Sequence, residues 1–308
     1  MLNFITGYEK LILKTYFLYK IKYFILISFF VYAFICNLLP AYAVDEHHSL
    51  PERIVSLGPI ITETIYLLGA DKKLIANTTY CIIPPDACLK EKIGTVTQMN
   101  VEKIISLSPD LVLANALTKQ KQINTLESLG IWVVKFENPK TFSEICRMTL
   151  KLGRILGKEE IAKQIIEKTR QEVDTVIEKT DKLPKKRVFI QIGIKPLHTA
   201  VKETFINEYI ELAGGENIAL NEKSGVYSRE KVLQENPDVI FIVTMGSSRT
   251  AGENEKAGWM KFISITASRN NEVYILDPYI ICSPTPVSFV KALKEIGKKL
   301  HPDIGLTE

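Results

Sequence analysis

A sixteen-residue segment occurs twice in this chain and constrains the fold more than any other feature. Residues 99–114, MNVEKIISLSPDLVLA, align without a gap with residues 227–242, YSREKVLQENPDVIFI, at an offset of 128. Each copy has the pattern of a short helix followed by an apolar strand. A second pair, ETIYLLGA at residues 63–70 and EYIELAGG at residues 208–215, matches at an offset of 145. The repeats predict two related lobes in one chain.

Short apolar segments alternate with helical patterns in both halves. The segments expected to form strands are RIVSLG, KLIANTTY, DLVLA and IWVVKF in the first half, and KRVFIQIG, DVIFIVT and EVYIL in the second. Helices are expected between them, including one over WMKFISI and a closing one over PVSFVKALKEIGKKL. Such alternation is typical of parallel sheets covered by helices on both faces. The expected fold is therefore α/β, with an N-terminal lobe over residues 52–140 and a C-terminal lobe over residues 184–303.

Residues 141–183 differ from both halves and predict helices alone. Thr141 to Glu144 has the sequence of a capping box, and Gly157 interrupts the helix that it opens. From residue 158 to about residue 181 apolar positions recur in steps of three and four, which indicates one long amphipathic helix. At ~1.5 Å per residue this helix would be roughly 35 Å long, enough to join the two lobes. Its predicted buried stripe is Ile161, Ile165, Thr169, Val173 and Val176 or Ile177.

Residues 1–43 have the layout of a secretory signal and are set apart from the fold. Four lysines precede an apolar run over residues 23–39, and Ala41-Tyr42-Ala43 follows as a cleavage site. We expect cleavage after Ala43 and a periplasmic protein, with an uncleaved membrane anchor as the alternative. Cys36 lies in no lipobox-like context. Without this segment the formal charge falls from +4 to +1, so the charge predicts no nucleic-acid partner.

Four cysteines remain after the signal segment. Cys81 and Cys88 flank the short segment IIPPDA, so they are a candidate pair for a local disulfide in an oxidising compartment. Cys282 is the competing partner for Cys81, and Cys146 is expected to be a buried thiol. No C-x-x-C motif occurs, and the adjacent pair His47-His48 lies near the expected mature N-terminus. No metal site is therefore predicted.

Two facing α/β lobes would form a cleft between them. Open α/β sheets bind ligands beyond the carboxyl ends of their strands, so the loops after the strands should line it. These loops are rich in glycine, proline and aromatic residues and hold no nucleophile–base pair or carboxylate dyad. The cleft is therefore predicted to hold a ligand and not to catalyse a reaction. The loop residues proposed to face it are Pro59, Tyr80, Lys195, Met245 and Tyr279.

Between Arg53 and Pro302 the chain resembles the helical-backbone substrate-binding proteins of ABC importers, a family that includes periplasmic receptors for cobalamin, ferric siderophores and haem. The resemblance implies two lobes joined by a rigid helix, a ligand bound between them with little closure, and a permease dimer as the partner. We expect a monomer without an intrinsic cofactor. The residues that carry the resemblance are, in the family's order, RIVSLGPIITETIYLLGA, TTYCIIPPDA, MNVEKIISLSPDLVLA, FINEYIELAGGENIA and YSREKVLQENPDVIFI.

The resemblance gives the repeated segment a role in docking. In this family an acidic residue of each repeat binds one permease subunit, and the matching residues are Glu102 and Glu230. A second explanation is local. Asn100 and Ser228 look like helix N-caps, which would place each carboxylate in a first turn, where the helix dipole favours it.

The resemblance leaves the ligand open between a ferric siderophore and a corrinoid. Tyr80 matches an aromatic residue that faces the ligand in the family's cobalamin receptors, and Tyr227 would supply a second ring. The cleft tryptophans of those receptors have no counterpart, because Trp132 and Trp259 fall in an expected strand and helix. Lys195 would meet an anionic chelate. The alternatives are haem held by a tyrosine or histidine, a bare metal ion, and a metalloenzyme of related, nitrogenase-type architecture.

Overall fold

The computed structural model describes residues 49–244 and 249–306. Leu50–Glu308 form one compact unit, which contains both of the predicted lobes. The expected signal segment and Met245 lie outside the described residues. Within the described part of the chain, no helix combines the length and the apolar character needed to cross a membrane.

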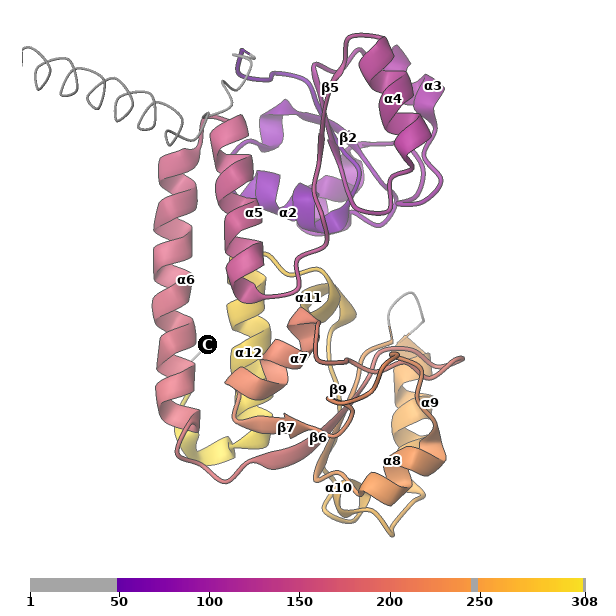
Figure 1. Cartoon of the computed structure of the whole chain (residues 1–308), viewed down its shortest axis with the longest axis vertical. Helices are drawn as coiled ribbons and strands as arrows, with labels where there is room; N and C mark the ends of the chain where they lie inside the picture. Colours follow the sequence, from indigo (N-terminus) through magenta and orange to yellow (C-terminus); the bar gives the residue numbers. More distant parts are fainter. Residues whose placement is uncertain (1–48, 245–248, 307–308) are drawn as a thin grey trace, which may run out of the picture. The chain divides into compact units, whose positions relative to one another are not determined.

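The N-terminal lobe, drawn from indigo to magenta in Figure 1, contains a parallel sheet. This sheet has five strands in the order β3-β2-β1-β4-β5. Every residue of β1 and β4 is buried, because helices cover both faces of the sheet. The strands are β1 (Ile54–Ser56), β2 (Leu74–Asn77), β3 (Glu91–Lys92), β4 (Leu111–Ala114) and β5 (Trp132–Lys135). The helices are α2 (Pro59–Leu67), α3 (Val101–Ser106) and α4 (Gln120–Ser128), with the 3-10 turns η1 (Asp71–Lys73) and η2 (Pro85–Leu89).

The C-terminal lobe repeats this plan with a four-stranded parallel sheet in the order β7-β6-β8-β9. Without its edge strand β3, the first sheet has the equivalent order β2-β1-β4-β5. In both sheets the lobe's first strand lies between its second and its third, and the fourth lies at the edge beside the third. The strands are β6 (Lys186–Gln191), β7 (Gly215–Asn217), β8 (Val239–Ile242) and β9 (Val273–Ile275). The helices are α7 (Phe205–Leu212), α8 (Arg229–Glu235), α9 (Arg249–Met260), α10 (Thr266–Arg269), α11 (Pro278–Cys282) and α12 (Pro286–Leu300), followed by η3 (Pro302–Ile304). The predicted fold of two related parallel-sheet lobes is confirmed.

The repeated segment has the same backbone role in both lobes. The Asp110 carboxylate accepts the backbone N–H of Arg53 at 3.0 Å, beside the start of β1. Its counterpart Asp238 accepts the N–H of Arg187 in β6 at 2.9 Å. Each aspartate thus holds the start of the first strand of its lobe. Two residues before each aspartate, at Ser108 and Asn236, the backbone has a left-handed conformation with φ +46°. The repeat therefore preserves a strained turn as well as a sequence.

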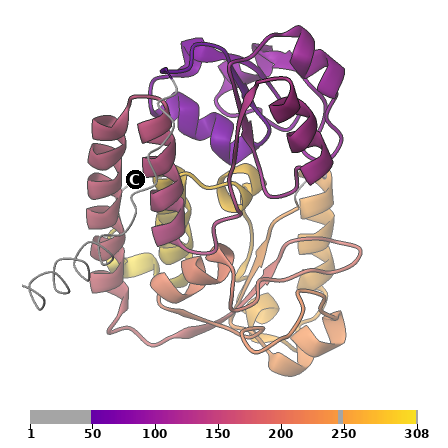
Figure 2. The same cartoon turned by 45° about the horizontal axis from the view of Figure 1, so that its top comes forward.

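Two helices link the lobes, as predicted. α5 (Phe142–Ile155) begins after Thr141, whose hydroxyl accepts the N–H of Glu144 at 3.2 Å. After the break at Gly157, α6 (Glu159–Thr180) packs along α5 and α12 (Figure 2). The boundaries proposed for the lobes and the linking segment from the sequence remain a proposal.

The first two residues predicted for the buried stripe of α6, Ile161 and Ile165, are wrong, because the buried residue at each place is the next one along the chain. The buried positions are Ala162, Ile166, Thr169, Val173, Val176 and Thr180, whereas Ile161 is 38% exposed. The cause is a close contact between helices. A Cβ atom on Gly153 of α5 would lie 2.7 Å from the Cβ of Ala162, so α6 must present a small residue there.

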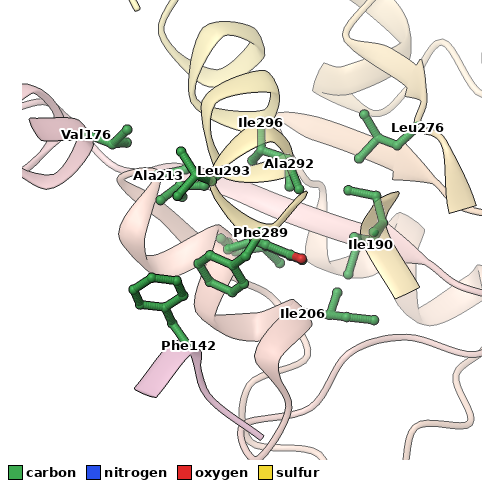
Figure 3. Close-up of a cluster of buried hydrophobic side chains, with 14 of the residues drawn as sticks. Phe142, Val176, Ile190, Ile206, Ala213, Leu276, Phe289, Ala292, Leu293 and Ile296 are labelled. Carbon is green, nitrogen blue, oxygen red and sulfur yellow. The ribbon is translucent and has the colours of Figure 1, made fainter. Parts of the chain in front are cut away.

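A shared apolar core joins the linking helices to the C-terminal lobe. Phe142 of α5 and Tyr209 of α7 both lie against Phe289 of α12, with ring centroids 4.8 Å and 4.4 Å from it. Figure 3 shows Phe142 and Phe289 facing each other, with Ile190 of β6 and Leu276 in the same cluster. The residues that pack the N-terminal sheet form separate clusters, one of which also includes Met148 and Leu152 of α5.

The helix predicted over WMKFISI is also wrong, because α9 lies earlier in the chain and ends at Met260. Its two glycines obscure the helical pattern. A Cβ on Gly252 would lie 3.3 Å from Ile275 Cγ2 and 3.4 Å from Thr244 Oγ1. The glycine therefore permits α9 to approach β9 closely, and this packing outweighs its poor helix propensity.

Candidate functional site

A cavity of about 590 Å³ lies between the two lobes. The N-terminal lobe contributes the start of α2 and segments that follow β2, β4 and β5, and the C-terminal lobe contributes the start of α7 and helix α11. Most of the wall therefore follows the carboxyl ends of parallel strands. The wall is mainly apolar, and its larger side chains include Pro59, Tyr80, Phe136, Met148, Phe205 and Tyr279.

Three of the residues proposed from the sequence lie in this wall. Pro59 is the first residue of α2, where its missing N–H costs no helical hydrogen bond. Tyr80 follows β2 and is 53% exposed. Tyr279 lies in α11, where the Asp277 carboxylate accepts its backbone N–H at 2.9 Å, and is 44% exposed. The two lobes thus each present one accessible phenol ring to the cavity.

The other proposed cleft residues lie elsewhere or outside the described chain. Tyr227 is 7% exposed and packs on Phe189, with 5.5 Å between ring centroids, so its ring faces the core of the C-terminal lobe. Its counterpart in the first repeat, Met99, is partly buried and also packs against a core cluster. Lys195 is exposed to solvent in the segment after β6. Met245 is outside the described residues.

Several wall residues escaped the sequence analysis. Phe136 and the residues up to Pro139 follow β5, and the rule that loops after strands line the cleft could have found them. Met148 and Phe205 lie within α5 and at the start of α7. That rule does not extend to helical residues, so only the packing of the lobes reveals them.

A second pocket of about 370 Å³ adjoins the cavity and shares Phe136, Met148 and the residues between Glu137 and Pro139 with it. Its rim carries cations. Lys151 Nζ lies 5.0 Å from the centre of the Phe136 ring, and Arg147 pairs with Glu144 at 3.2 Å. Among the described residues, no group of three histidine, cysteine, aspartate or glutamate side chains is placed to hold a metal ion.

All four described cysteines are free thiols in the structure, and the pairing of the candidate cysteines Cys81 and Cys88 stays a prediction. The two sulfur atoms have different surroundings. The Cys81 sulfur is buried between the hydroxyls of Thr62 and Thr78, at 3.2 Å and 3.1 Å. Cys88 is exposed, and its sulfur lies 3.6 Å from the carbonyl oxygen of Ile82.

This arrangement predicts one fast-reacting thiol. Burial raises the pKa of Cys146 to about 11 and that of Cys282 to about 12, so both stay protonated at about pH 8, where thiolates are the reactive form. In native, unreduced protein beginning at Val44, we expect about one rapid equivalent with a disulfide reagent such as DTNB. Cys88→Ser should remove it. A rapid equivalent that emerges only after reduction would instead show that Cys88 is in a disulfide.

Glu102 and Glu230 occupy matching first turns of α3 and α8, and both side chains are exposed. The predicted N-caps are present: Asn100 accepts the N–H of Lys103 at 2.8 Å, and Ser228 accepts that of Lys231 at 3.2 Å. The pKa of Glu230 is lowered by its own backbone N–H and by the Ser228 hydroxyl.

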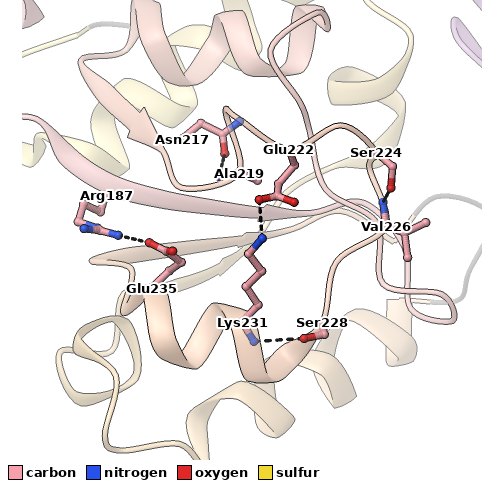
Figure 4. Close-up of polar contacts among 9 residues, drawn as sticks. All are labelled: Arg187, Asn217, Ala219, Glu222, Ser224, Val226, Ser228, Lys231 and Glu235. Carbon is pink, nitrogen blue, oxygen red and sulfur yellow. Dashed lines mark hydrogen bonds and ion pairs between the residues drawn. The ribbon is translucent and has the colours of Figure 1, made fainter.

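The lysine after each of these glutamates is held within its own lobe. Lys103 forms an ion pair with Glu91 and Lys231 forms one with Glu222 (Figure 4). Neither Glu102 nor Glu230 forms an ion pair with a described residue. Each repeat thus presents a carboxylate to solvent beside a neutralised lysine.

The chain matches the family of periplasmic binding proteins over residues 54–280. It is 30% identical over 261 residues to an uncharacterized ABC transporter substrate-binding lipoprotein of Bacillus subtilis. The alignment covers 82% of this chain and 81% of that protein. It is 32% identical over 224 residues to the vitamin B12-binding protein of Yersinia pseudotuberculosis. That alignment covers 72% of this chain and 79% of the Yersinia protein.

A solved structure has the same fold. The crystal structure of the periplasmic vitamin B12 binding protein of Vibrio cholerae is 28% identical and matches with a TM-score of 0.70 over 82% of this chain and 97% of that one. The relatives are solute-binding transport proteins and not enzymes, in agreement with the absence of a catalytic role predicted from the sequence. With its duplicated parallel-sheet lobes and the cavity between them, the chain belongs to the periplasmic binding protein family.

Proposed function

We propose that this protein captures a metal chelate, either a corrinoid or a ferric siderophore, and delivers it to the permease dimer of an ABC importer. The observation that carries the proposal is the cavity between the lobes. Its volume of about 590 Å³ and mainly apolar wall suit an organic ligand. A dimeric permease offers two related contacts, and the duplicated chain presents Glu102 and Glu230 at matching places.

A corrinoid has the stronger support of the two ligands, because the Yersinia and Vibrio relatives are named as vitamin B12-binding proteins. A ferric siderophore is supported by the cationic rim of the adjoining pocket, where Lys135, Arg147 and Lys151 would attract an anionic chelate. Haem is the alternative, favoured by the phenols of Tyr80 and Tyr279, because a tyrosine oxygen can hold haem iron.

Replacement of either exposed cavity tyrosine by alanine should weaken binding of cyanocobalamin about tenfold, because each removes one ring face from a mainly apolar wall. Isothermal titration of wild type, Tyr80→Ala and Tyr279→Ala with cyanocobalamin, haemin and the anionic chelate ferric enterobactin measures the effect and ranks the ligands. Tyr227→Phe is the matched control, because its buried hydroxyl lies in the lobe core and should leave affinity unchanged. Absence of binding of all three ligands to wild type would refute the proposed function.

We further propose that the protein is exported, with its leader removed after Ala43. The Bacillus subtilis relative is named a lipoprotein, so a lipid-anchored form is the competing possibility. N-terminal sequencing of the exported protein should give Val44 as the first residue. An intact Met1 or a lipidated cysteine would contradict this expectation.

A further inference from the structure

Two glutamates occupy the same place in the two halves of the chain. Glu63 of α2 and Glu208 of α7 match in the second repeat, at its offset of 145. Both helices are followed by a glycine with a left-handed backbone, Gly69 at φ +68° and Gly214 at φ +75°. The two positions are therefore related in structure as well as in sequence.

Each copy of the repeated plan also ends in a long helix, which is α5 in the first half of the chain and α12 in the second. These two helices are related in the same way. α5 follows the N-cap Thr141 and α12 follows the N-cap Thr285, and each hydroxyl accepts a backbone N–H three residues on at 3.2 Å. Gly153 and Gly297 then fall at the same place in α5 and α12. The chain thus contains two copies of one pair: a short helix with a glutamate and a long helix with a threonine cap.

Each glutamate bonds to the long helix of the opposite half. The Glu208 carboxylate accepts the backbone N–H of Phe142, the first residue of α5. The Thr285 hydroxyl donates to Glu63 Oε1 over 3.1 Å, at the start of α12. The contacts are exchanged between the halves and share one physical basis, since the positive end of a helix dipole favours a carboxylate.

Both carboxylates are partly buried at this boundary. Burial raises the pKa of Glu63, against a smaller opposing effect from the hydroxyls of Thr285 and Ser288. Burial also raises the pKa of Glu208, which the N–H of Phe142 lowers and the nearby Glu211 and Glu144 raise. A buried charge is a poor means of stabilising a fold compared with an apolar side chain of similar size. Its presence at two matching positions therefore points to control of geometry.

The two bonds join elements that contribute residues to the cavity wall. α2 brings Pro59 and α7 brings Phe205 into the cavity wall. On the other side of each bond, Ser283 lies in the wall two residues before Thr285, and α5 brings Met148 into it. Each carboxylate therefore links a wall segment of one half to a wall segment of the other.

We propose that Glu63 and Glu208 are a symmetry-related pair of positioning residues that hold the two cavity walls at a fixed separation. They act through the N-termini of α12 and α5 and do not need to touch the ligand. The effect on the lobes is independent of ligand identity, whereas the effect on affinity rests on the proposed function.

Spin labels on opposite lobes test the proposal without ligand. The labels are placed at Glu127→Cys on α4 and Glu253→Cys on α9, both exposed, in a Cys88→Ser, Cys282→Ser background. In the Glu63→Leu, Glu208→Leu variant the side-chain volume remains but the acceptors are lost. We expect the distribution of label-to-label distances to widen about two-fold, because the lobes lose their fixed separation. The melting temperature is measured on the same variant, because the loss of an acceptor for the Phe142 N–H and the Thr285 hydroxyl opposes the gain from removing two partly buried charges.

Two further variants separate positioning from stability. Glu63→Gln, Glu208→Gln keeps a carbonyl acceptor at each site and should retain a narrow distance distribution. Glu255→Ala removes a partly buried carboxylate that bonds to Gln191 and Arg229 within the C-terminal lobe alone, so it should lower the melting temperature without widening the distribution. A folded double leucine variant with the wild-type distribution overturns the proposal.

A binding measurement with cyanocobalamin distinguishes this inference from the proposed function. If wild type binds it, the double leucine variant should bind about tenfold more weakly, because the walls are no longer held in place for the ligand. If wild type does not bind it, the proposed ligand is wrong, and the distance measurement still decides whether the glutamates set the separation of the lobes.

Discussion

Charge reversal at Glu102 and Glu230 together should reduce uptake of cyanocobalamin by at least about tenfold while leaving its affinity for the isolated protein unchanged. Both carboxylates are exposed at matching first turns, away from the cavity wall. A lysine at either place would add a second cation beside Lys103 or Lys231, and basic pockets on a permease would then repel the lobe. Single replacements should have smaller effects, because one docking contact per complex would remain.

Uptake into vesicles containing the permease, at saturating cyanocobalamin, measures this effect. The matched control is Glu127→Lys, Glu253→Lys, which makes the same change in net charge at exposed sites on α4 and α9. The local explanation makes a different forecast. If the two first-turn glutamates only stabilise their helices, each replacement should lower stability slightly and leave uptake at the control level. Equal uptake by the two double variants would therefore rule out docking through these carboxylates.

The sequence was sufficient for the features that depend on local pattern. The repeated segment predicted related lobes because its pattern of a short helix followed by an apolar strand lies within sixteen contiguous residues. The caps at Asn100 and Ser228 were predictable for the same reason, since the bond closes within three residues. The loops after strands gave Pro59 and Tyr80 because parallel sheets expose those ends to a ligand.

The sequence was insufficient where contacts between distant elements decide. The start of the α6 stripe depends on the glycine that α5 presents at Gly153, and a search for large apolar residues selects Ile161 in place of Ala162. Tyr227 looks like a cleft aromatic until its packing on Phe189 is known. The roles of Glu63 and Glu208 are also hidden, because their partners lie 222 and 66 residues away.

Removal of the Phe289 ring should produce a large loss of stability. The ring is fully buried between Phe142 and Tyr209, in the core that joins α5, α7 and α12. Phe289→Ala should therefore lower the free energy of unfolding by about 3–5 kcal/mol, because it removes apolar contacts and leaves a cavity that this packed core cannot fill by collapse. Phe262→Ala is the matched control, since Phe262 is only partly buried, packs against a different cluster of the C-terminal lobe, and should cost less when removed.

The two tryptophans show whether this loss reaches both lobes. Trp132 is in β5 and Trp259 is in α9, so Trp259→Phe and Trp132→Phe backgrounds each leave one lobe with a fluorescent reporter. α5 supplies residues to the core around Phe289 and, through Met148 and Leu152, to the core of the N-terminal lobe. Urea unfolding should consequently shift to lower midpoints at both reporters in Phe289→Ala. A shift at Trp259 with no change at Trp132 would mean that the lobes unfold independently and that α5 does not couple their cores.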